Sequence, residues 1–177
     1  MLLTNEQNSN RNKLTVVAFP AQTPILGKNE IFFLFSVRQI LSVLDPSDIV
    51  LPADNSNPSR GTAEWRGKQF PILSLEKSLG LPVSKTVSKY RIIAIREVYK
   101  SSKNNFQDVH ALCQIGTTLR RWQLPIECQP IEAPRWISQP SFLKGVYRME
   151  KSVFLVPHLK EIVTKTKFNR TEVVHSG

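Results

Sequence analysis

The sequence is poor in the residues on which several classes of site depend. It has two cysteines, Cys113 and Cys128, which is too few for a disulfide framework, so a reducing compartment is the simpler expectation. Its seven glycines are dispersed along 177 residues, and they form no glycine-rich loop of the kind that cradles a nucleotide phosphate. The longest apolar run, residues 31–35, is far too short to span a bilayer. The polar N-terminus predicts no secretory signal, and we expect a cytoplasmic protein.

Side chains that would carry catalysis or hold a metal ion are also few and dispersed. His110 and Cys113, together with Cys128, would supply three metal ligands. Cys113 lies in an apolar segment, however, where a buried thiol is an ordinary core residue. A nucleophilic pair of Cys113 and a histidine would have only Asp108 nearby as an orienting acid. We therefore expect no enzymatic activity, no metal, no cofactor and no small-molecule substrate.

The charge of the chain is strongly positive and unevenly distributed. The formal net charge is +10, and residues 1–60 contribute none of it because they hold five basic and five acidic side chains. A field of this sign favours an acidic partner such as a protein, a nucleic acid or a membrane surface. Basic residues this scattered are equally typical of an ordinary solvated surface. The cluster Arg120-Arg121-Trp122 is suited to stacking on single-stranded nucleic acid, so a basic β-barrel that binds nucleic acid is the alternative function.

Short apolar or alternating segments, separated by proline-containing turns, predict a mostly-β fold. We expect a disordered lead over residues 1–13, a folded domain over residues 14–166 and a flexible tail over residues 167–177. The expected elements are a strand over residues 14–19 that ends at Pro20, a loop over residues 22–28, a strand over residues 90–99, and a helix over residues 158–166 that Pro157 opens.

The most informative stretch is residues 61–82, which reads as strand, tight turn, strand and short capped helix. Arg66-Gly67-Lys68 is predicted to be the turn, because glycine adopts a positive φ without steric cost. Ser74 is predicted to cap the helix at its N-terminus and Gly80 to end it. Trp65 has two interpretations, as a packed residue of the strand or as an aromatic anchor for a partner, since Trp and Arg are enriched in interface hot spots.

The order and spacing of this stretch resemble the signature of CheW-like chemotaxis coupling proteins. In that signature Gly61 precedes the Arg66-Gly67 turn, a proline-containing apolar strand follows, and a Leu-Gly-Leu-Pro sequence (residues 79–82) closes it. Residues 37–41, Val-Arg-Gln-Ile-Leu, are similar to the Val-x-Glu-Ile strand of the family. The resemblance extends over roughly residues 14–165.

The resemblance implies a fold and a function. The fold would be two small five-stranded SH3-like β-barrels around a shared hydrophobic core, with a short C-terminal helix. The protein would be a non-catalytic adaptor that couples the cytoplasmic tip of a chemoreceptor to the regulatory domain of a chemotaxis-type histidine kinase. It would serve chemotaxis or pilus-based motility, without insertion into a membrane and without a nucleic-acid partner.

The resemblance also places a protein-binding surface on the hairpin and on the strand at residues 37–41. The implied residues are Val37, Gln39, Ile40, Gly61, Trp65 and Arg66. Gln39 stands where the family commonly has an acidic residue, which in some members pairs with the arginine of the turn. Arg66 would then lack that partner, which affects the choice of binding partner more than the fold.

Overall fold

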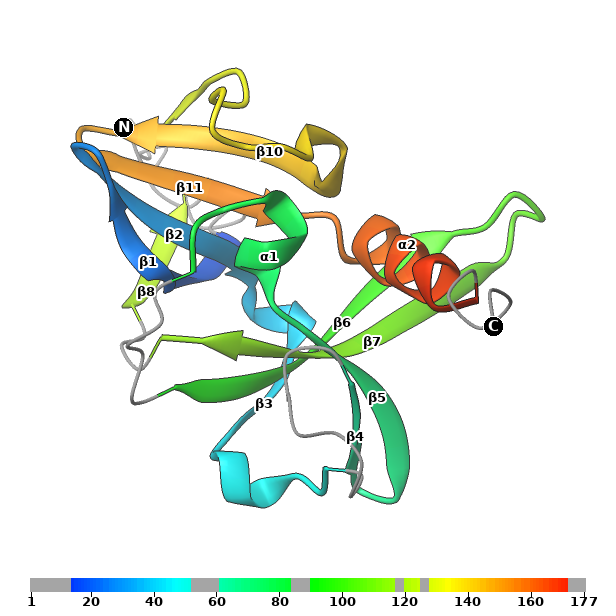
Figure 1. The fold of residues 1–177 in the computed structure, drawn as a ribbon. Coiled ribbons are helices and arrows are strands. Elements are labelled where there is room, and N and C mark those ends of the chain that lie inside the picture. The colour runs from blue at the N-terminus through cyan, green and yellow to red at the C-terminus, as the bar shows by residue number, and fades with distance from the viewer. Residues whose placement is uncertain (1–13, 52–60, 84–89, 117–119, 125–127, 172–177) are drawn as a thin grey trace, which may run out of the picture.

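The computed structural model describes residues 14–51, 61–83, 90–116, 120–124 and 128–171 (Figure 1). Most of these residues form strands in two sheets, which confirms the mostly-β prediction. The first sheet is six-stranded, in the order β8 (Arg120–Leu124), β1 (Leu14–Leu26), β2 (Asn29–Ser36), β11 (Ser152–Pro157), β10 (Leu143–Met149) and β9 (Gln129–Pro130). Its β2 and β11 strands run parallel, and its other neighbouring strands are antiparallel.

The second sheet is five-stranded and curls into a half-barrel. Its order is β3 (Ile40–Leu44), β6 (Arg91–Lys100), β7 (Phe106–Ile115), β5 (Lys68–Leu73) and β4 (Thr62–Trp65). After β3 a 3₁₀ turn, η3 (Pro46–Asp48), carries the chain across to the opposite edge. There Val50 and Glu64 exchange two backbone hydrogen bonds of 3.1 and 2.9 Å, which join the segment after β3 to β4.

Alternating side chains divide the interior into three clusters. On β2, Phe33 and Phe35 point into a core shared by the two sheets, while the preceding Phe32 joins a second cluster with Ala18 and Phe154. On the other sheet the residues of β6 alternate in the same way between the shared core and a third cluster around Trp65. Because both faces of these strands are buried, they read as continuous apolar runs. A core between the sheets and one further cluster on each sheet is the arrangement expected of two barrels that share a hydrophobic core.

Strand β1 differs from its prediction. Pro20 does not end the strand, and residues 22–26 are not a loop, since β1 continues to Leu26. The pairing with β2 shifts register between Pro20 and Ile25. Proline cannot donate a backbone hydrogen bond, so an irregular segment of this kind is where a strand can contain one. The chain turns instead at Gly27, whose φ is 64°.

Helix α1 confirms both of its predicted caps, whereas α2 differs from its prediction. In α1 (Leu75–Leu79) the Ser74 hydroxyl accepts a hydrogen bond from Lys77 N at 3.3 Å, and Gly80 ends the helix with a φ of 73°, as predicted. Helix α2 (Leu159–Thr171) begins later and ends later than expected, so residues 167–171, assigned to a flexible tail, are helical. Pro157 ends β11 and does not open the helix. The expected lead at residues 1–13 lies outside the described residues. No helix in the described part of the chain is long and apolar enough to cross a membrane.

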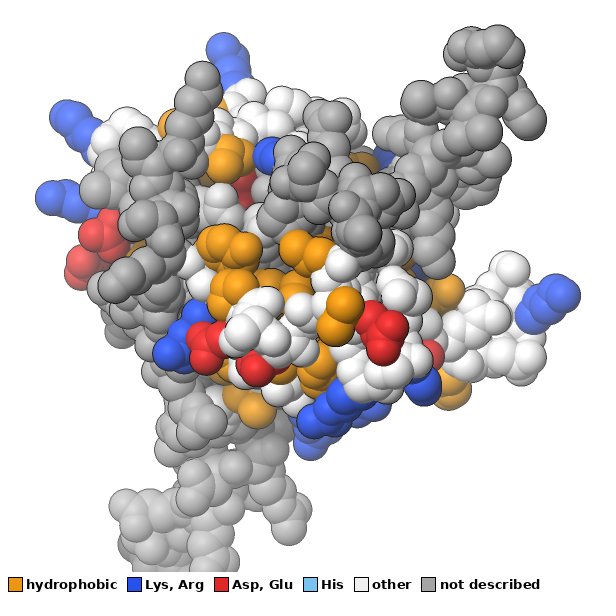
Figure 2. Space-filling view, turned by 60° about the horizontal axis from the view of Figure 1, so that its bottom comes forward, with side chains coloured by type: hydrophobic (Ala, Val, Ile, Leu, Met, Phe, Trp, Pro, Cys, Tyr) orange, Lys and Arg blue, Asp and Glu red, His pale blue; other side chains and the backbone are white. Residues whose placement is uncertain are grey.

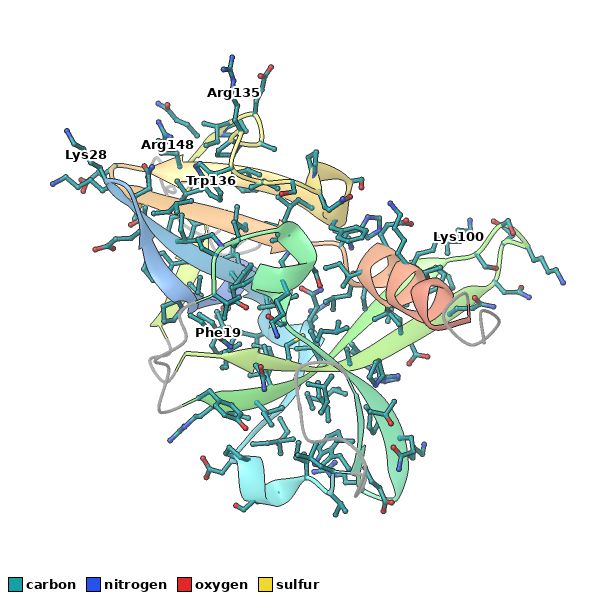
Figure 3. All side chains as sticks on the ribbon, viewed as in Figure 1. Phe19, Lys28, Lys100, Arg135, Trp136 and Arg148 are labelled. Atoms are coloured by element: carbon teal, nitrogen blue, oxygen red, sulfur yellow. The ribbon has the colours of Figure 1, made fainter. Side chains whose placement is uncertain are left out.

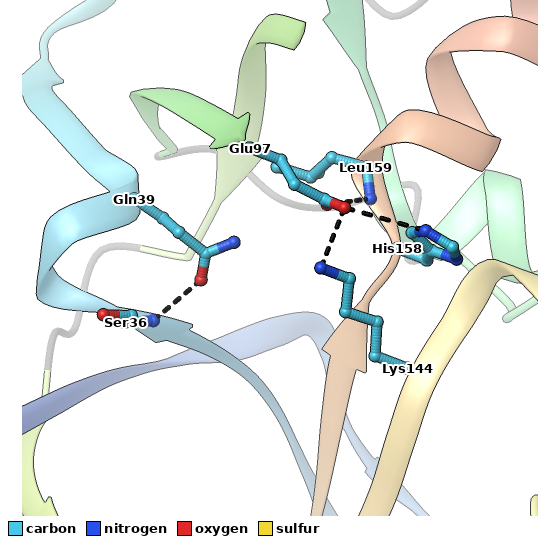
Figure 4. A network of polar contacts seen from close by, with 6 residues as sticks. All are labelled: Ser36, Gln39, Glu97, Lys144, His158 and Leu159. Atoms are coloured by element: carbon cyan, nitrogen blue, oxygen red, sulfur yellow. Dashed lines mark hydrogen bonds and ion pairs between the residues drawn. The ribbon is translucent and has the colours of Figure 1, made fainter. Parts of the chain in front are cut away.

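A buried carboxylate joins both sheets and the second helix (Figure 4). Glu97 of β6 has a side chain that is 3% exposed, and its Oε1 lies 2.8 Å from Lys144 Nζ of β10. Its other oxygen, Oε2, accepts a hydrogen bond of 2.8 Å from the backbone N–H of Leu159 at the start of α2. His158 Nε2 is 3.7 Å from Oε1. The negative charge is therefore paired with a cation and placed at the positive end of a helix, which compensates for its burial.

A second buried carboxylate, Glu76, attaches α1 to β1. Its Oε1 accepts a hydrogen bond of 2.8 Å from Gln22 N, and the Ser74 hydroxyl lies 3.3 Å from Oε2. Glu76 is completely buried, and this burial raises the pKa of its carboxyl above the ordinary value. The hydrogen bonds and Lys77 oppose the shift without cancelling it.

Two glycines with similar backbone angles should respond differently to alanine. Gly67 (φ 70°) and Gly80 (φ 73°) both lie in the left-handed region, where a Cβ costs about 1–2 kcal/mol. At Gly67 a Cβ would meet no atom within 4 Å, but at Gly80 it would collide with the side chain of Ser138. Denaturant unfolding is expected to show a loss of about 1 kcal/mol for Gly67→Ala and at least about twice that for Gly80→Ala. Ser138→Gly should relieve the excess, and equal losses would contradict the clash.

The pH dependence of stability should carry the signature of Glu76. Because the folded state binds the Glu76 proton more tightly than the unfolded chain does, this group contributes stability below pH 4.5 that is lost as the pH rises through the folded-state pKa. Glu76→Gln retains an acceptor for Gln22 N and removes the titration. The unfolding free energy of the wild type, minus that of the variant, should therefore fall as the pH rises from about 4.5 toward neutrality. A difference that is constant over this range would contradict the raised pKa.

Candidate partner-binding surface

The β4–β5 hairpin turns at Arg66 and Gly67 as predicted, but Lys68, which the prediction included in the turn, begins β5. Trp65 and Lys68 face each other across the strands, and Arg66 and Gly67 connect them with φ values of 53° and 70°. Positive φ at both central positions is the requirement of a type I′ turn. The β4–β5 turn lies at the end of the half-barrel (Figure 1), and Arg66 is exposed there.

Trp65 is a packed residue of the second barrel rather than a free anchor. It is 8% exposed and lies in the cluster with Ala63 and Ile72, and its ring centroid is 5.8 Å from that of Phe70. The guanidinium carbon of Arg66 lies 4.5 Å from the centroid of the Trp65 ring, which is the geometry of a cation–π contact. Of the two interpretations of Trp65, the packed one describes its position. Its ring also supports Arg66, which is exposed.

Gly61 is buried, and its part in the structure is local. Its carbonyl accepts a hydrogen bond of 3.0 Å from Ile72 N, which fixes the entry of the chain into β4. This position offers no side chain and little accessible backbone to a partner.

The segment at residues 37–41 is only partly a strand, contrary to prediction. Val37–Gln39 form a 3₁₀ turn, η2, and β3 begins at Ile40. Ser36 N donates a hydrogen bond of 2.9 Å to Gln39 Oε1 (Figure 4). The Ser36 hydroxyl accepts a hydrogen bond of 3.3 Å from Arg38 N. This reciprocal capping stabilises the turn. A glutamate at this position would accept the same hydrogen bond, so glutamine preserves the cap without the charge.

The structure does not bring η2 and Arg66 together. Figure 1 places η2 near the junction of the two sheets and the β4–β5 turn at the free end of the half-barrel. At η2, Val37 is 36% exposed, while Ile40 is half-buried and packs against the shared core. Of the predicted contact residues, Val37 and Arg66 are exposed, Gln39 and Ile40 are partly accessible, and the other two are buried.

An exposed apolar surface at the same free end was not predicted from the sequence. The η3 patch, as we define it, consists of Leu41 and Val43 on the outer side of β3 and of Val50 and Leu51 after η3. Val50 has the largest exposed fraction of the four, 65%. Figure 2, which brings this end of the molecule forward, shows hydrophobic side chains gathered there with charged side chains around them. The spacing of Leu41 and Val43, on one face of a strand, was a signal for this surface.

The residues considered for metal binding do not form a cluster. Cys113 is fully buried in the shared core, whereas Cys128 packs on the six-stranded sheet beside Tyr147 and Met149. Burial raises the pKa of both thiols, most strongly that of Cys113. No three His, Cys, Asp or Glu side chains lie close enough to hold a metal ion in the described part of the chain. The side chains of Arg120, Arg121 and Trp122 lie outside the described residues.

Comparisons with known proteins agree with this geometry. The solved structure of the scaffolding protein TtCheW from Thermoanaerobacter tengcongensis is similar over 90% of this chain and 91% of that one, with a TM-score of 0.54 and 15% identity. At this identity the likeness concerns the fold. No curated protein matches the sequence significantly. The model of the CheW-like domain matches residues 25–167. The chain therefore belongs to the family of CheW-like domains, which are non-catalytic scaffolds of chemotaxis signal transduction, and it is not an enzyme.

Proposed function

We propose that the protein acts in the cytoplasm as an adaptor that couples the tip of a chemoreceptor to the regulatory domain of a chemotaxis-type histidine kinase. The observation that carries this proposal is the exposed η3 patch, whose Val50 pairs with Glu64, two residues before the exposed Arg66. Exposed apolar side chains surrounded by polar ones are typical of protein interaction sites, and arginine is enriched in interface hot spots.

An adaptor has to hold two partners at once, and the fold offers two separate surfaces for this. One is the η3 patch with Arg66. The other is the surface at η2, where Val37 is exposed and Ile40 lies beside it at the junction of the sheets. Because η2 lies near the junction of the two sheets and the β4–β5 turn at the free end of the half-barrel (Figure 1), a partner centred on Val37 and a partner centred on Arg66 would contact different parts of the chain.

The energetic role of Arg66 follows from its position in the turn. Its side chain is exposed and makes one aromatic contact, with Trp65, so its removal leaves no buried group unsatisfied. Arg66 already adopts a positive φ of 53°, and alanine at this position would adopt the same φ, so the substitution adds no backbone strain. A loss of binding in Arg66→Ala would therefore report on the interface rather than on folding.

Substitutions at the two surfaces should separate the two partners. After a pull-down from the native cell has identified receptor and kinase, Arg66→Ala is expected to weaken one of them by about 1–2 kcal/mol with little change in melting temperature. Val50→Asp should weaken the same partner, because it places a charge in the apolar contact. Val37→Asp should instead weaken the other partner.

Lys28→Ala, a change of an exposed cation on the six-stranded sheet, is the matched control and should leave both affinities unchanged. Isothermal titration with the purified partners measures all four variants. Full retention of both partners by Arg66→Ala and Val50→Asp would contradict the assignment of this surface. A pull-down that contains neither a receptor nor a histidine kinase would contradict the proposed function itself.

A further inference from the structure

The distal half of the β6–β7 hairpin projects as a two-stranded ribbon. The pairing of β3 with β6 extends to Ile95, and β5 pairs with β7 at Leu112 and Cys113. Beyond these residues β6 and β7 pair with each other up to Lys100 and Phe106. Helix α2 lies against one face of the ribbon, where Lys160 Nζ is 4.7 Å from the centroid of the Tyr99 ring (Figure 1).

The opposite face of the ribbon carries two of the most exposed apolar side chains among the described residues. Directly opposed residues of an antiparallel pair point to one face, and here Val98 opposes Asp108 while Lys100 opposes Phe106. Residues two apart on a strand share a face, so Arg96 lies on it as well. Phe106 is 78% exposed and Val98 is 55% exposed.

The charge around these apolar side chains is net positive, because three cations outnumber the single carboxylate on this face, that of Asp108. Arg96, Lys100 and Lys103 are exposed, and none of them makes an ion pair with another described residue. The acidic residue on this face, Asp108, has an oxygen 3.4 Å from His110 Nε2. The ribbon thus presents an apolar tip with Arg96 and Lys100 on the same face and Lys103 in the turn, each without an ion-pair partner among the described residues, on a chain whose net charge is +10.

We propose that this hairpin face, formed by Arg96, Val98, Lys100, Lys103 and Phe106, is a peripheral docking site for an anionic phospholipid surface. Phe106 would enter the boundary between headgroups and acyl chains, while the cations would remain among the headgroups, where each adds electrostatic attraction. The contact is independent of the η3 patch and of Arg66, and it goes beyond the proposed adaptor function.

The shape of the hairpin face favours a lipid surface over an acidic protein. A stable protein interface buries about 800 Å² on each partner, more than two exposed apolar side chains on a narrow ribbon provide. A fluid bilayer accepts a convex protrusion without a matching groove. The positive field of the whole chain also attracts it to any extended anionic surface before contact.

Vesicle flotation with the full chain tests this site. The vesicles are an equimolar mixture of phosphatidylcholine and phosphatidylserine, and phosphatidylcholine alone is the reference. Lys100→Glu/Lys103→Glu should reduce the partition coefficient on anionic vesicles at least about tenfold, and Phe106→Ser about fivefold. The matched control is Lys28→Glu/Lys151→Glu, which makes the same charge change at exposed lysines of the other sheet and should retain binding within about twofold. Figure 3 shows Lys28 and Lys100 at opposite ends of the molecule.

Three results would overturn the proposal. The first is equal binding to neutral and anionic vesicles, or no binding to either. The second is an equal loss in the two double variants, which would show that net charge rather than the hairpin face drives binding. The third is undiminished binding by Phe106→Ser.

Poly-L-glutamate serves as a soluble acidic probe, and binding to it through the same lysines without binding to vesicles would reassign the face to an acidic protein. Unchanged melting temperatures establish that each variant is folded.

Discussion

Both sheets bury one face in a common core, and this packing constrains the rest of the structure. Phe33, Phe35 and Leu155 enter it from the six-stranded sheet, and Ile93 and Ile95 enter it from the five-stranded sheet. Because the opposite faces of the same strands are also buried, there is little room for polar side chains in these segments. The carboxylate of Glu97 at the junction is accordingly matched by a lysine, a histidine and the first N–H of α2. Removing one of these partners would leave the buried charge less well compensated, and such a change strongly lowers the free energy of unfolding.

The surfaces proposed to bind other molecules lie where this core ends. The half-barrel closes through Val50 and Glu64, and its free end exposes the η3 patch and Arg66. The ribbon of β6 and β7 continues past the strands that flank it and exposes Phe106. In each place apolar side chains remain accessible because no further element covers them in the described part of the chain. A scaffold without a catalytic site presents such surfaces to other molecules, and its rigid core keeps them at fixed separation.

Features determined by a few consecutive residues could be predicted from the sequence. The turn at Gly67 and the caps at Ser74 and Gly80 follow from local backbone preferences, and the structure has all three. Features determined by distant contacts could not. The continuation of β1 past Pro20 depends on pairing with β2, and α2 extends to Thr171 although local signals ended it earlier. At the candidate site, exposure of Arg66 follows from its turn, whereas burial of Trp65 and the capping role of Gln39 depend on neighbours that the sequence does not place.

Because the two sheets share one core, we expect them to unfold as one unit. Leu155→Ala removes a fully buried side chain of the six-stranded sheet from this core, at an expected cost of about 2–5 kcal/mol. Native-state hydrogen exchange should then show the backbone amides of β6 and β7 losing the same protection free energy as those of β1 and β2. If the amides of β6 and β7 kept their wild-type protection while those of β1 and β2 lost theirs, the sheets would be independent units and the account would be contradicted.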